Sequence, residues 1–295
     1  MGSVITLSHR PPTLLHMKAH MNTEFGEASG GTHSSEERAN LIVSLVHEQG
    51  FQSIEALSAR FGVSTQTIRR DVNALCDKGL CRRRHGGIDL LPEGENVTYL
   101  ARRVLNQEAK AAIARCVAEQ VPDGASLFFG IGTTPEQCAH ALADRARLRV
   151  MTNNLNVAAA LVRNPGCEIT IAGGRLRNQD NDVVAGEAHR FFSHYHVDIG
   201  IFGVGGVAED GSLLDFSPDE VHMRQQLAQH CRLRFLVLDH TKFGRAATVR
   251  GGHITEVSQV FTDQPVPAAI ADMLRQARVH LNIACNESPV SLITA

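Results

Sequence analysis

The chain has 295 residues, of which 43% are hydrophobic and 20% are charged, and its formal net charge is −2 at pH 7. This length exceeds that of a typical single hydrophobic core, so we expect one small and one large domain. The small net charge excludes an overall basic protein, and any nucleic-acid contact must therefore come from a local basic cluster. The sequence contains no apolar run of membrane-spanning length, so we expect no membrane partner.

The two ends and the cysteines place further limits on the class of protein. Residues 1–34 are rich in Gly, Ser, His, Thr and Pro without apolar periodicity, which predicts a disordered leader, and residues 286–295 form a predicted tail. No apolar segment typical of a signal peptide is present. The seven cysteines include no C-x-x-C pair, which indicates buried thiols in a reducing compartment. We therefore expect a cytoplasmic protein without a metal site or a cofactor.

Residues 35–91 show three segments with the apolar spacing of helices. Their predicted inward faces are Leu41, Ile42, Leu45 and Val46, then Ile54, Leu57 and Phe61, and then Ile68, Val72 and Leu75. Ser53 and Ser64 are of the N-cap type, while Gly50 and Gly62 are typical of helix ends. The short turn Gly62-Val63-Ser64 between the second and third segments predicts a helix-turn-helix, whose last helix enters the major groove of DNA.

The segment after the third helix predicts a basic wing. Residues 80–88 form a short strand that turns at Gly86-Gly87, and Lys78 with Arg82, Arg83 and Arg84 supplies positive charge for a phosphate backbone. An isolated basic triplet is more often a solvated strand edge. This triplet follows a helix that exposes Thr65, Gln66, Thr67, Arg69 and Arg70, with Gln66 and Thr67 placed to face base edges. We therefore predict a unit that binds double-stranded DNA.

The run "VSTQTIRRDVNALCDKGLCRRRHGG" resembles the DNA-binding signature of the DeoR family of bacterial repressors. The resemblance implies that Thr65, Gln66, Thr67, Arg69 and Arg70 serve the recognition helix, and that Arg83, Arg84 and His85 serve the wing. With Ser64 at the start of the helix and Arg82 at the start of the wing, these residues form the predicted DNA-binding set.

Beyond a predicted linker, residues 92–105, the pattern is that of an α/β domain, residues 106–285. Short β-rich runs ("ASLFF", "LRVMT", "CEITIA", "VDIGIFGV", "RFLVL" and "SQVFT") alternate with helical stretches, which predicts a doubly wound, mainly parallel sheet. Small and polar residues follow the strands at Gly130–Thr134, Asn153-Asn154, Gly173-Gly174-Arg175, Gly203–Gly206 and Asp239–Lys242. Because ligands bind at the carboxyl ends of parallel strands, we expect these loops to share one crevice.

The loop at Gly132 is predicted to bind a phosphate. Thr134 and Pro135 have the pattern of an N-cap followed by a first-turn proline, which leaves backbone N–H groups beside Gly132 and Thr133. Lys242 can add a cation, although a lone lysine is more often only solvated. The glycines could alternatively serve only a tight turn. A dinucleotide site is disfavoured because "GIGTTP" lacks a third glycine, and a Walker loop because no G-K-[ST] follows.

The resemblance to the DeoR family extends from about Glu36 to Ala284 through "GTTPEQCAHAL", "TNNLNVA", "AGGRLR", "GSLLDF" and "DHTKFGR". It implies a ribose-5-phosphate-isomerase-like sensor domain and a repressor that glycerol 3-phosphate or a related phosphorylated metabolite releases from operator DNA. The residues implied to surround this effector are Gly132, Thr133, Thr134, Asn153, Asn154, Gly173, Gly174 and Lys242. One departure is Gly130, which stands where the family usually carries an aspartate.

The leading hypothesis is therefore a homo-oligomeric transcriptional repressor rather than an enzyme. The alternative is a sugar-phosphate isomerase with an accessory DNA-binding domain, which would need a general base. With Gly130 in place of a strand-end acid, Asp215, Asp239 and Glu220 are the weak candidates for that base.

Overall fold

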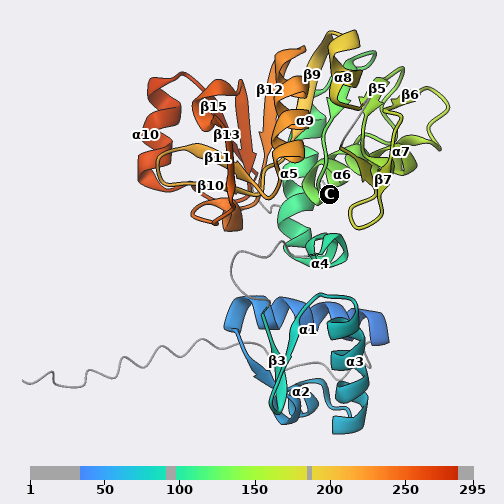
Figure 1. Cartoon of the computed structure of the whole chain (residues 1–295), viewed down its shortest axis with the longest axis vertical. Coiled ribbons are helices and arrows are strands. Elements are labelled where there is room, and N and C mark those ends of the chain that lie inside the picture. The colour runs from blue at the N-terminus through green and yellow to red at the C-terminus, as the bar shows by residue number, and fades with distance from the viewer. Residues whose placement is uncertain (1–33, 91–97, 185–187, 285–295) are drawn as a thin grey trace, which may run out of the picture. The chain divides into compact units, whose positions relative to one another are not determined.

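The computed structural model describes residues 34–90, 98–184 and 188–284. An N-terminal helical unit, drawn in blue to teal, and an α/β unit, drawn in green to red, make up the described chain (Figure 1). The predicted tail and all of the predicted leader except Ser34 lie outside the described residues. Ser34 itself caps the first helix, so the leader prediction extends one residue too far.

The three predicted helices of the N-terminal unit are confirmed. They are α1 Ser35–Gln49, α2 Ile54–Phe61 and α3 Thr65–Asp77. Ser53 and Ser64 cap α2 and α3 by accepting hydrogen bonds from the backbone N–H groups of Ala56 and Thr67, and Gly62 ends α2 in the left-handed conformation. The predicted inward faces are buried, except that Leu41 is 41% exposed and Phe61 is half-buried.

The predicted wing is also present. Strands β2 Arg82–Arg84 and β3 Gly87–Asp89 pair antiparallel, and β1 Gln52–Ser53 pairs with the other edge of β3. A Cβ atom on Gly87 would lie 2.2 Å from the Gln52 carbonyl oxygen, so only glycine permits this close approach of β1 to β3. The wing is therefore attached to the helices through its second strand.

The linker prediction is wrong over its second half, because residues 99–104 form a helix, α4 Tyr99–Val104, capped by Thr98. The Tyr99 side chain is buried, and its hydroxyl donates a 2.6 Å hydrogen bond to Glu136 Oε2 of the α/β unit. Burial of an aromatic ring stabilises a helix that is too short to be stable alone.

The α/β unit is built on one parallel seven-stranded sheet, as predicted. Its spatial order is β15-β14-β12-β9-β4-β5-β6. The strands are β4 Ser126–Phe129, β5 Arg149–Thr152, β6 Glu168–Ile171, β9 Val197–Phe202, β12 Cys231–Val237, β14 Gln259–Thr262 and β15 His280–Ile283. The last of these is absent from the predicted set.

Helices cover both faces of this sheet, which makes it doubly wound (Figure 1). The helices are α5 Gln107–Gln120, α6 Thr133–Ala141, α7 Leu155–Leu161, α8 Ala188–Phe191, α9 Pro218–Gln229 and α10 Ala268–Gln276, with the 3₁₀ turn η1 Phe192–His194. Alternate residues of β4 belong to different cores: Leu127 and Phe129 pack with α5, α6 and α7, whereas Phe128 packs with η1 and α9.

Shorter strands add two small antiparallel sheets. These are the hairpin β7 Leu176–Arg177 with β8 Asp182–Val183, and the three-stranded sheet of β10 Gly206–Val207, β11 Ser212–Asp215 and β13 Val249–His253. The 3₁₀ turns η2 His240–Lys242 and η3 Ile254–Glu256 complete the unit.

The strand order reverses between β4 and β9. The chain runs outward from β4 to β5 and β6, and then returns to the other side of β4 to place β9, β12, β14 and β15. Such a switch point leaves a crevice at the carboxyl ends of the two neighbouring strands, because their connections leave in opposite directions. The loops that begin at Gly130 and Gly203 follow these two strands.

Candidate functional site

A pocket lies at the switch point between β4 and β9, and we call it the switch-point pocket. It is lined by residues 131–135 after β4, 203–205 after β9, Arg102 of α4, both strands of the β7–β8 hairpin, the start of α9 and the segment around η2. Four of the predicted effector-binding residues line it, namely Gly132, Thr133, Thr134 and Lys242. The predicted crevice at the strand ends therefore exists, with part of the predicted set around it.

The first turn of α6 forms one wall of this pocket. Gly132 is the N-cap, with φ 120°, and no side chain caps the helix. The backbone N–H groups of Thr133 and Thr134 therefore belong to the helix turn that has no intrahelical acceptor, and the positive end of the helix dipole lies with them. The prediction of Thr134 as the cap is wrong, because the helix begins one residue before it. An uncapped helix start of this kind favours a bound anion.

Two cations stand on the same pocket wall. Lys242, in η2, and Arg245 both line the pocket, and among the described residues no carboxylate forms an ion pair with either. Burial, together with the positive charges of Arg245, Arg102 and Lys110, lowers the pKa of Lys242 to about 7 against the opposing effect of Asp239. Because like charges are held close together here, an anion would relieve their repulsion.

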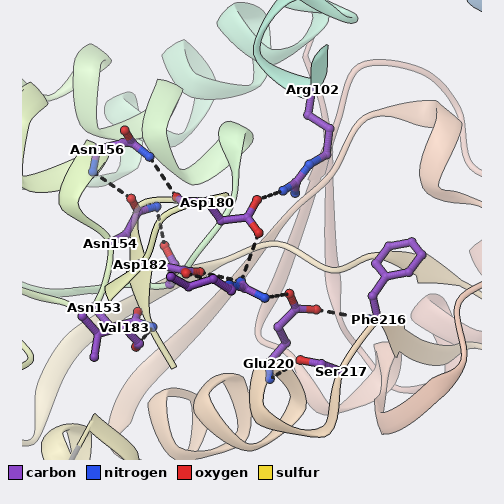
Figure 2. Close-up of polar contacts among 12 residues, drawn as sticks. Arg102, Asn153, Asn154, Asn156, Asp180, Asp182, Val183, Phe216, Ser217 and Glu220 are labelled. Atoms are coloured by element: carbon purple, nitrogen blue, oxygen red, sulfur yellow. Dashed lines mark hydrogen bonds and ion pairs between the residues drawn. The ribbon is translucent and has the colours of Figure 1, made fainter. Parts of the chain in front are cut away.

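The pocket is also lined by an ion-pair network centred on Arg177, whose partners Asp180, Asp182 and Glu220 are labelled in Figure 2. Its guanidinium donates to both carboxylate oxygens of Asp182 at 2.9 and 2.7 Å and to Glu220 Oε1 at 2.8 Å, and it lies 3.3 Å from Asp180 Oδ2. Burial raises the pKa of Asp182, and Arg177 opposes this rise. The pocket therefore has one cationic wall and one wall of paired charges, which suits a ligand with one anionic and one hydroxylated end.

The remaining predicted effector residues differ in their surroundings. Asn153 donates to the Val183 carbonyl at 2.9 Å, while its buried Oδ1 atom has no partner and borders a small cavity beside Gly130. Asn154 caps α7 by accepting from the Asn156 N–H at 2.9 Å, and it does not line the switch-point pocket. Gly173 and Gly174 are exposed and do not line that pocket either.

Gly130, which replaces the family's usual acid, packs closely on its neighbours. A Cβ atom there would lie 3.2 Å from Phe202 Cβ and 3.5 Å from Leu227 Cδ1. The small cavity bordered by Asn153 and Gly130 also reaches Glu220 and Asp215. Carboxylates on other strands and helices therefore remain near the position of the missing aspartate.

Arg102, Arg177 and Arg245 are pocket residues that the sequence did not predict. Arg177 and Arg245 are the last residues of the motifs "AGGRLR" and "DHTKFGR", so the resemblance already contained them without assigning them a role. Arg102 had no such signal, because it falls in the predicted linker.

The predicted DNA-binding residues form two exposed groups. On α3, Thr65, Gln66, Arg69 and Arg70 are exposed, whereas Thr67 is half-buried and its hydroxyl lies 3.0 Å from the Ser64 hydroxyl. The wing residues Arg82, Arg83, Arg84 and His85 are all exposed. Ser64 and Thr67 are thus engaged in capping α3, while the other residues have side chains open to solvent.

The wing arginines have different partners. Arg82 and Arg84 both pair with Asp89, at 3.2 and 3.0 Å, because alternate residues of a strand face the same side. Arg83 faces the other way: burial raises the pKa of the Cys76 thiol of α3, and the neighbouring Arg83 guanidinium opposes that rise. Arg83 is therefore the wing arginine whose charge no carboxylate offsets among the described residues.

Each of the candidate general bases has a structural partner. Asp215 pairs with Arg224 at 2.9 Å and accepts from the Gly205 N–H, and Glu220 accepts from Arg177. Asp239 accepts hydrogen bonds from Thr241 and Asn106. These contacts hold the three carboxylates in place; Asp215 and Glu220 line the switch-point pocket, and Asp239 lines the cavity beside it.

Three further observations concern the described part of the chain. It contains no cluster of three or more His, Cys, Asp or Glu side chains arranged to hold a metal ion. None of its helices has the length and apolarity needed to cross a membrane. Of its six cysteines, Cys81, Cys138 and Cys231 are buried as predicted, whereas Cys76, Cys116 and Cys167 are half-buried.

A winged helix-turn-helix followed by an α/β unit with a pocket at its switch point is typical of helix-turn-helix regulators with a C-terminal sensor domain. Residues 38–93 match the DeoR-like helix-turn-helix domain, and residues 105–264 match the DeoR C terminal sensor domain. The chain belongs to the DeoR family.

Its similar relatives carry names of repressors. The glycerol-3-phosphate regulon repressor of Escherichia coli K12 is 42% identical over 247 residues, which cover 84% of this chain and 98% of that protein. The protein of the same name from Haemophilus influenzae is 41% identical over 84% of this chain and 96% of its own length. The HTH-type transcriptional repressor CsqR of Escherichia coli K12 is 36% identical over 83% of this chain and 94% of its own length.

Among solved structures, ribose 5-phosphate isomerase A from Methanocaldococcus jannaschii is similar with a TM-score of 0.35 and 15% identity, covering 47% of this chain and 55% of that chain. A D-ribose-5-phosphate isomerase in complex with phospho-erythronic acid gives a TM-score of 0.35 and 11% identity, covering 46% of this chain and 54% of that chain.

Proposed function

We propose that this protein is a DNA-binding transcriptional repressor of glycerol 3-phosphate metabolism, and that a small phosphorylated metabolite, with glycerol 3-phosphate as the first candidate, releases it from operator DNA. The observation that carries the proposal is the cationic wall of the switch-point pocket. There, the uncapped start of α6 meets Lys242 and Arg245, which have no carboxylate partners among the described residues. Family membership and the names of the relatives support the same assignment.

The pocket suggests how each end of the ligand is bound. The phosphate contacts Gly132, Thr133, Thr134, Lys242 and Arg245, because helix N–H groups and cations both favour an anion. The hydroxyl groups meet the Asn153 amide oxygen and the Asp182 and Glu220 carboxylates across the pocket and its neighbouring small cavity. Asn154, Gly173 and Gly174 act indirectly, by holding the loops after β5 and β6.

At the other end of the chain, α3 enters the major groove and the wing contacts phosphates. Gln66 reads base edges near the start of α3, and Arg69, Arg70, Arg82, Arg83, Arg84 and His85 supply positive charge to the backbone. We further propose that the protein acts in the cytoplasm as a homo-oligomer, since paired half-sites on DNA require paired recognition helices. No contact of Asp215, Asp239 or Glu220 favours the isomerase alternative.

Thermal denaturation in the presence of a panel of compounds tests this proposal. A ligand that binds only the folded state raises the melting temperature by mass action. We expect glycerol 3-phosphate to stabilise the protein and glycerol at the same concentration to have no effect. Lys242→Ala should abolish the stabilisation, whereas Arg163→Ala, an exposed arginine outside the pocket lining, should leave it unchanged. If no phosphorylated compound of three to six carbons stabilises the wild type, the sensing function is wrong.

A further inference from the structure

Arg102 is a pocket residue that comes from the helix next to the connection between the two units. It lies on α4, the first described element after residues 91–97, and it lines the switch-point pocket opposite the β7–β8 hairpin. Its guanidinium donates to Asp180 Oδ1 of that hairpin (Figure 2). Its Nε atom is buried and has no hydrogen-bond partner. A buried donor left unpaired is costly, so Arg102 retains an unused capacity to bind an acceptor.

Asp180 is a partner that Arg102 shares with Arg177. It is 5% exposed, and its other carboxylate oxygen lies 3.3 Å from Arg177. Arg177 has stronger contacts with Asp182 and Glu220, so it does not depend on Asp180 for its charge balance. The Arg102–Asp180 ion pair therefore joins Arg102 to the network of paired charges. If this ion pair is lost, Arg177 keeps its contacts with Asp182 and Glu220.

Arg102 also belongs to the cationic side of the pocket. Its charge contributes to the lowered pKa values of both Lys242 and Arg245, after the larger effect of burial. Arg102, Lys242 and Arg245 line the switch-point pocket together with Thr133, and the same four residues line an adjoining cavity of about 640 Å³. An anion at the start of α6 thus lies among three cations, and Arg102 is the only one of the three that forms an ion pair with a carboxylate among the described residues.

The other polar contacts of α4 are with α6 and α5. Tyr99 donates to Glu136 in the first turn of α6, the helix whose start forms the anion seat. The Lys110 ammonium donates to the carbonyl oxygens of Arg102 and Leu105 at the end of α4. Helix α4 is therefore held by contacts with α5, α6 and the β7–β8 hairpin, and residues 91–97 separate it in the sequence from the DNA-binding unit.

We propose that Arg102 is a ligand-binding residue of the sensor, and that the phosphate of the effector takes its guanidinium from Asp180. Asp180 is then a competitor of the ligand, and loss of the Arg102–Asp180 ion pair releases α4 from the hairpin when the pocket fills. This inference rests on the proposed function and extends it, because it names the contact through which occupancy of the pocket reaches the connecting helix.

Isothermal titration calorimetry with glycerol 3-phosphate and with inorganic phosphate tests the inference. It compares two variants that should change the affinity for both anions in opposite directions. Arg102→Gln removes the ligand contact and should weaken the binding of both anions by about tenfold or more, the usual effect of a lost charge-assisted hydrogen bond. Asp180→Asn removes the competitor and should tighten the binding of both. Arg102→Lys keeps the charge and should restore part of the affinity. Arg115→Gln, an exposed arginine on α5, is the matched control and should bind like the wild type.

The outcomes separate this inference from the proposed function. A wild type that binds neither anion overturns both. A wild type that binds, with Arg102→Gln binding equally well, overturns the role of Arg102 alone. Equal weakening by Arg102→Gln and Asp180→Asn also overturns it, because a purely structural ion pair has that signature. If Arg102→Gln fails to fold, the direction of the Asp180→Asn effect and the affinity of Arg102→Lys decide the question.

Discussion

Strand alternation divides the three arginines of the wing. Arg82 and Arg84 share Asp89, while Arg83 projects to the opposite side with no carboxylate partner among the described residues. A cation that is not neutralised within the protein releases a full counterion when it meets a DNA phosphate. The charge of Arg83 is therefore more available to DNA than that of its two neighbours.

We predict that Arg83→Ala reduces the salt dependence of DNA binding by about one unit in the slope of log K against log salt concentration. Arg82→Ala should reduce the slope by less, because Asp89 already neutralises part of the charge of Arg82. The slope is measured by fluorescence anisotropy of labelled duplex DNA at salt concentrations from about 50 to about 200 mM. The exposed Arg163→Ala is the control. Equal slopes for Arg83→Ala and the wild type would place the wing outside the DNA interface.

The pKa of Lys242, lowered to about 7 by burial and neighbouring cations, predicts a pH dependence of effector binding. Above that pH the free lysine is largely neutral, and an anion restores its charge, so binding takes up a proton and the affinity falls as pH rises from 7 to 9. The phosphate itself is already a dianion in this range, because its second pKa is about 6. Calorimetry in buffers of different ionisation enthalpy measures the uptake.

Lys242→Gln is the variant that assigns this proton. Lys110 lines the adjoining cavity and its pKa is lowered to about 8 by burial, so it is the second group that could take up a proton. Whatever affinity Lys242→Gln retains should no longer fall between pH 7 and pH 8. Proton uptake that persists in this variant would assign the effect to Lys110, and a pH-independent affinity in the wild type would contradict the prediction.

The orientation of the recognition helix depends on a buried ion pair between helices. Arg38 Nε of α1 donates to Asp71 Oδ2 of α3 at 2.7 Å, and both side chains are less than a tenth exposed, at 9% and 7%. Removing one partner of such a pair costs about 3–5 kcal/mol, because the other charge stays buried and loses this ion pair. We predict that Asp71→Ala unfolds the N-terminal unit and abolishes DNA binding.

The same variant should leave the sensor intact. Thermal denaturation of Asp71→Ala should retain a transition that glycerol 3-phosphate shifts upward, since Asp71 belongs to the N-terminal unit and does not line the switch-point pocket. Asp77→Ala, an exposed change on the same helix, is the matched control and should bind DNA like the wild type. Wild-type DNA affinity in Asp71→Ala would show that the buried pair does not position α3.

Local patterns predicted most of the elements, because caps, helical spacing and strand-end loops are encoded within a few residues. The caps Ser53 and Ser64 and the loop at Gly132 are examples. Contacts between distant residues could not be predicted in this way. Arg177 reaches Glu220, 43 residues away, through a hairpin whose strands have two residues each. Likewise, α4 has six residues, and the buried Tyr99 that holds it contacts a helix 37 residues further along the chain.

The recognition helix α3 and the switch-point pocket lie on separate units of one chain. Coupling between them must be reciprocal, so a ligand that weakens DNA binding itself binds less tightly to the DNA-bound protein. Binding of DNA should therefore lower the affinity for glycerol 3-phosphate by the same factor by which saturating glycerol 3-phosphate lowers the affinity for DNA.

The most direct test of the account is the anisotropy of a labelled duplex from the region upstream of the gene, titrated with glycerol 3-phosphate at fixed salt and protein concentration. The DNA should be bound without ligand and released over the concentration range in which glycerol 3-phosphate stabilises the protein, while glycerol should release none. DNA that stays fully bound when the sensor is saturated would contradict this prediction.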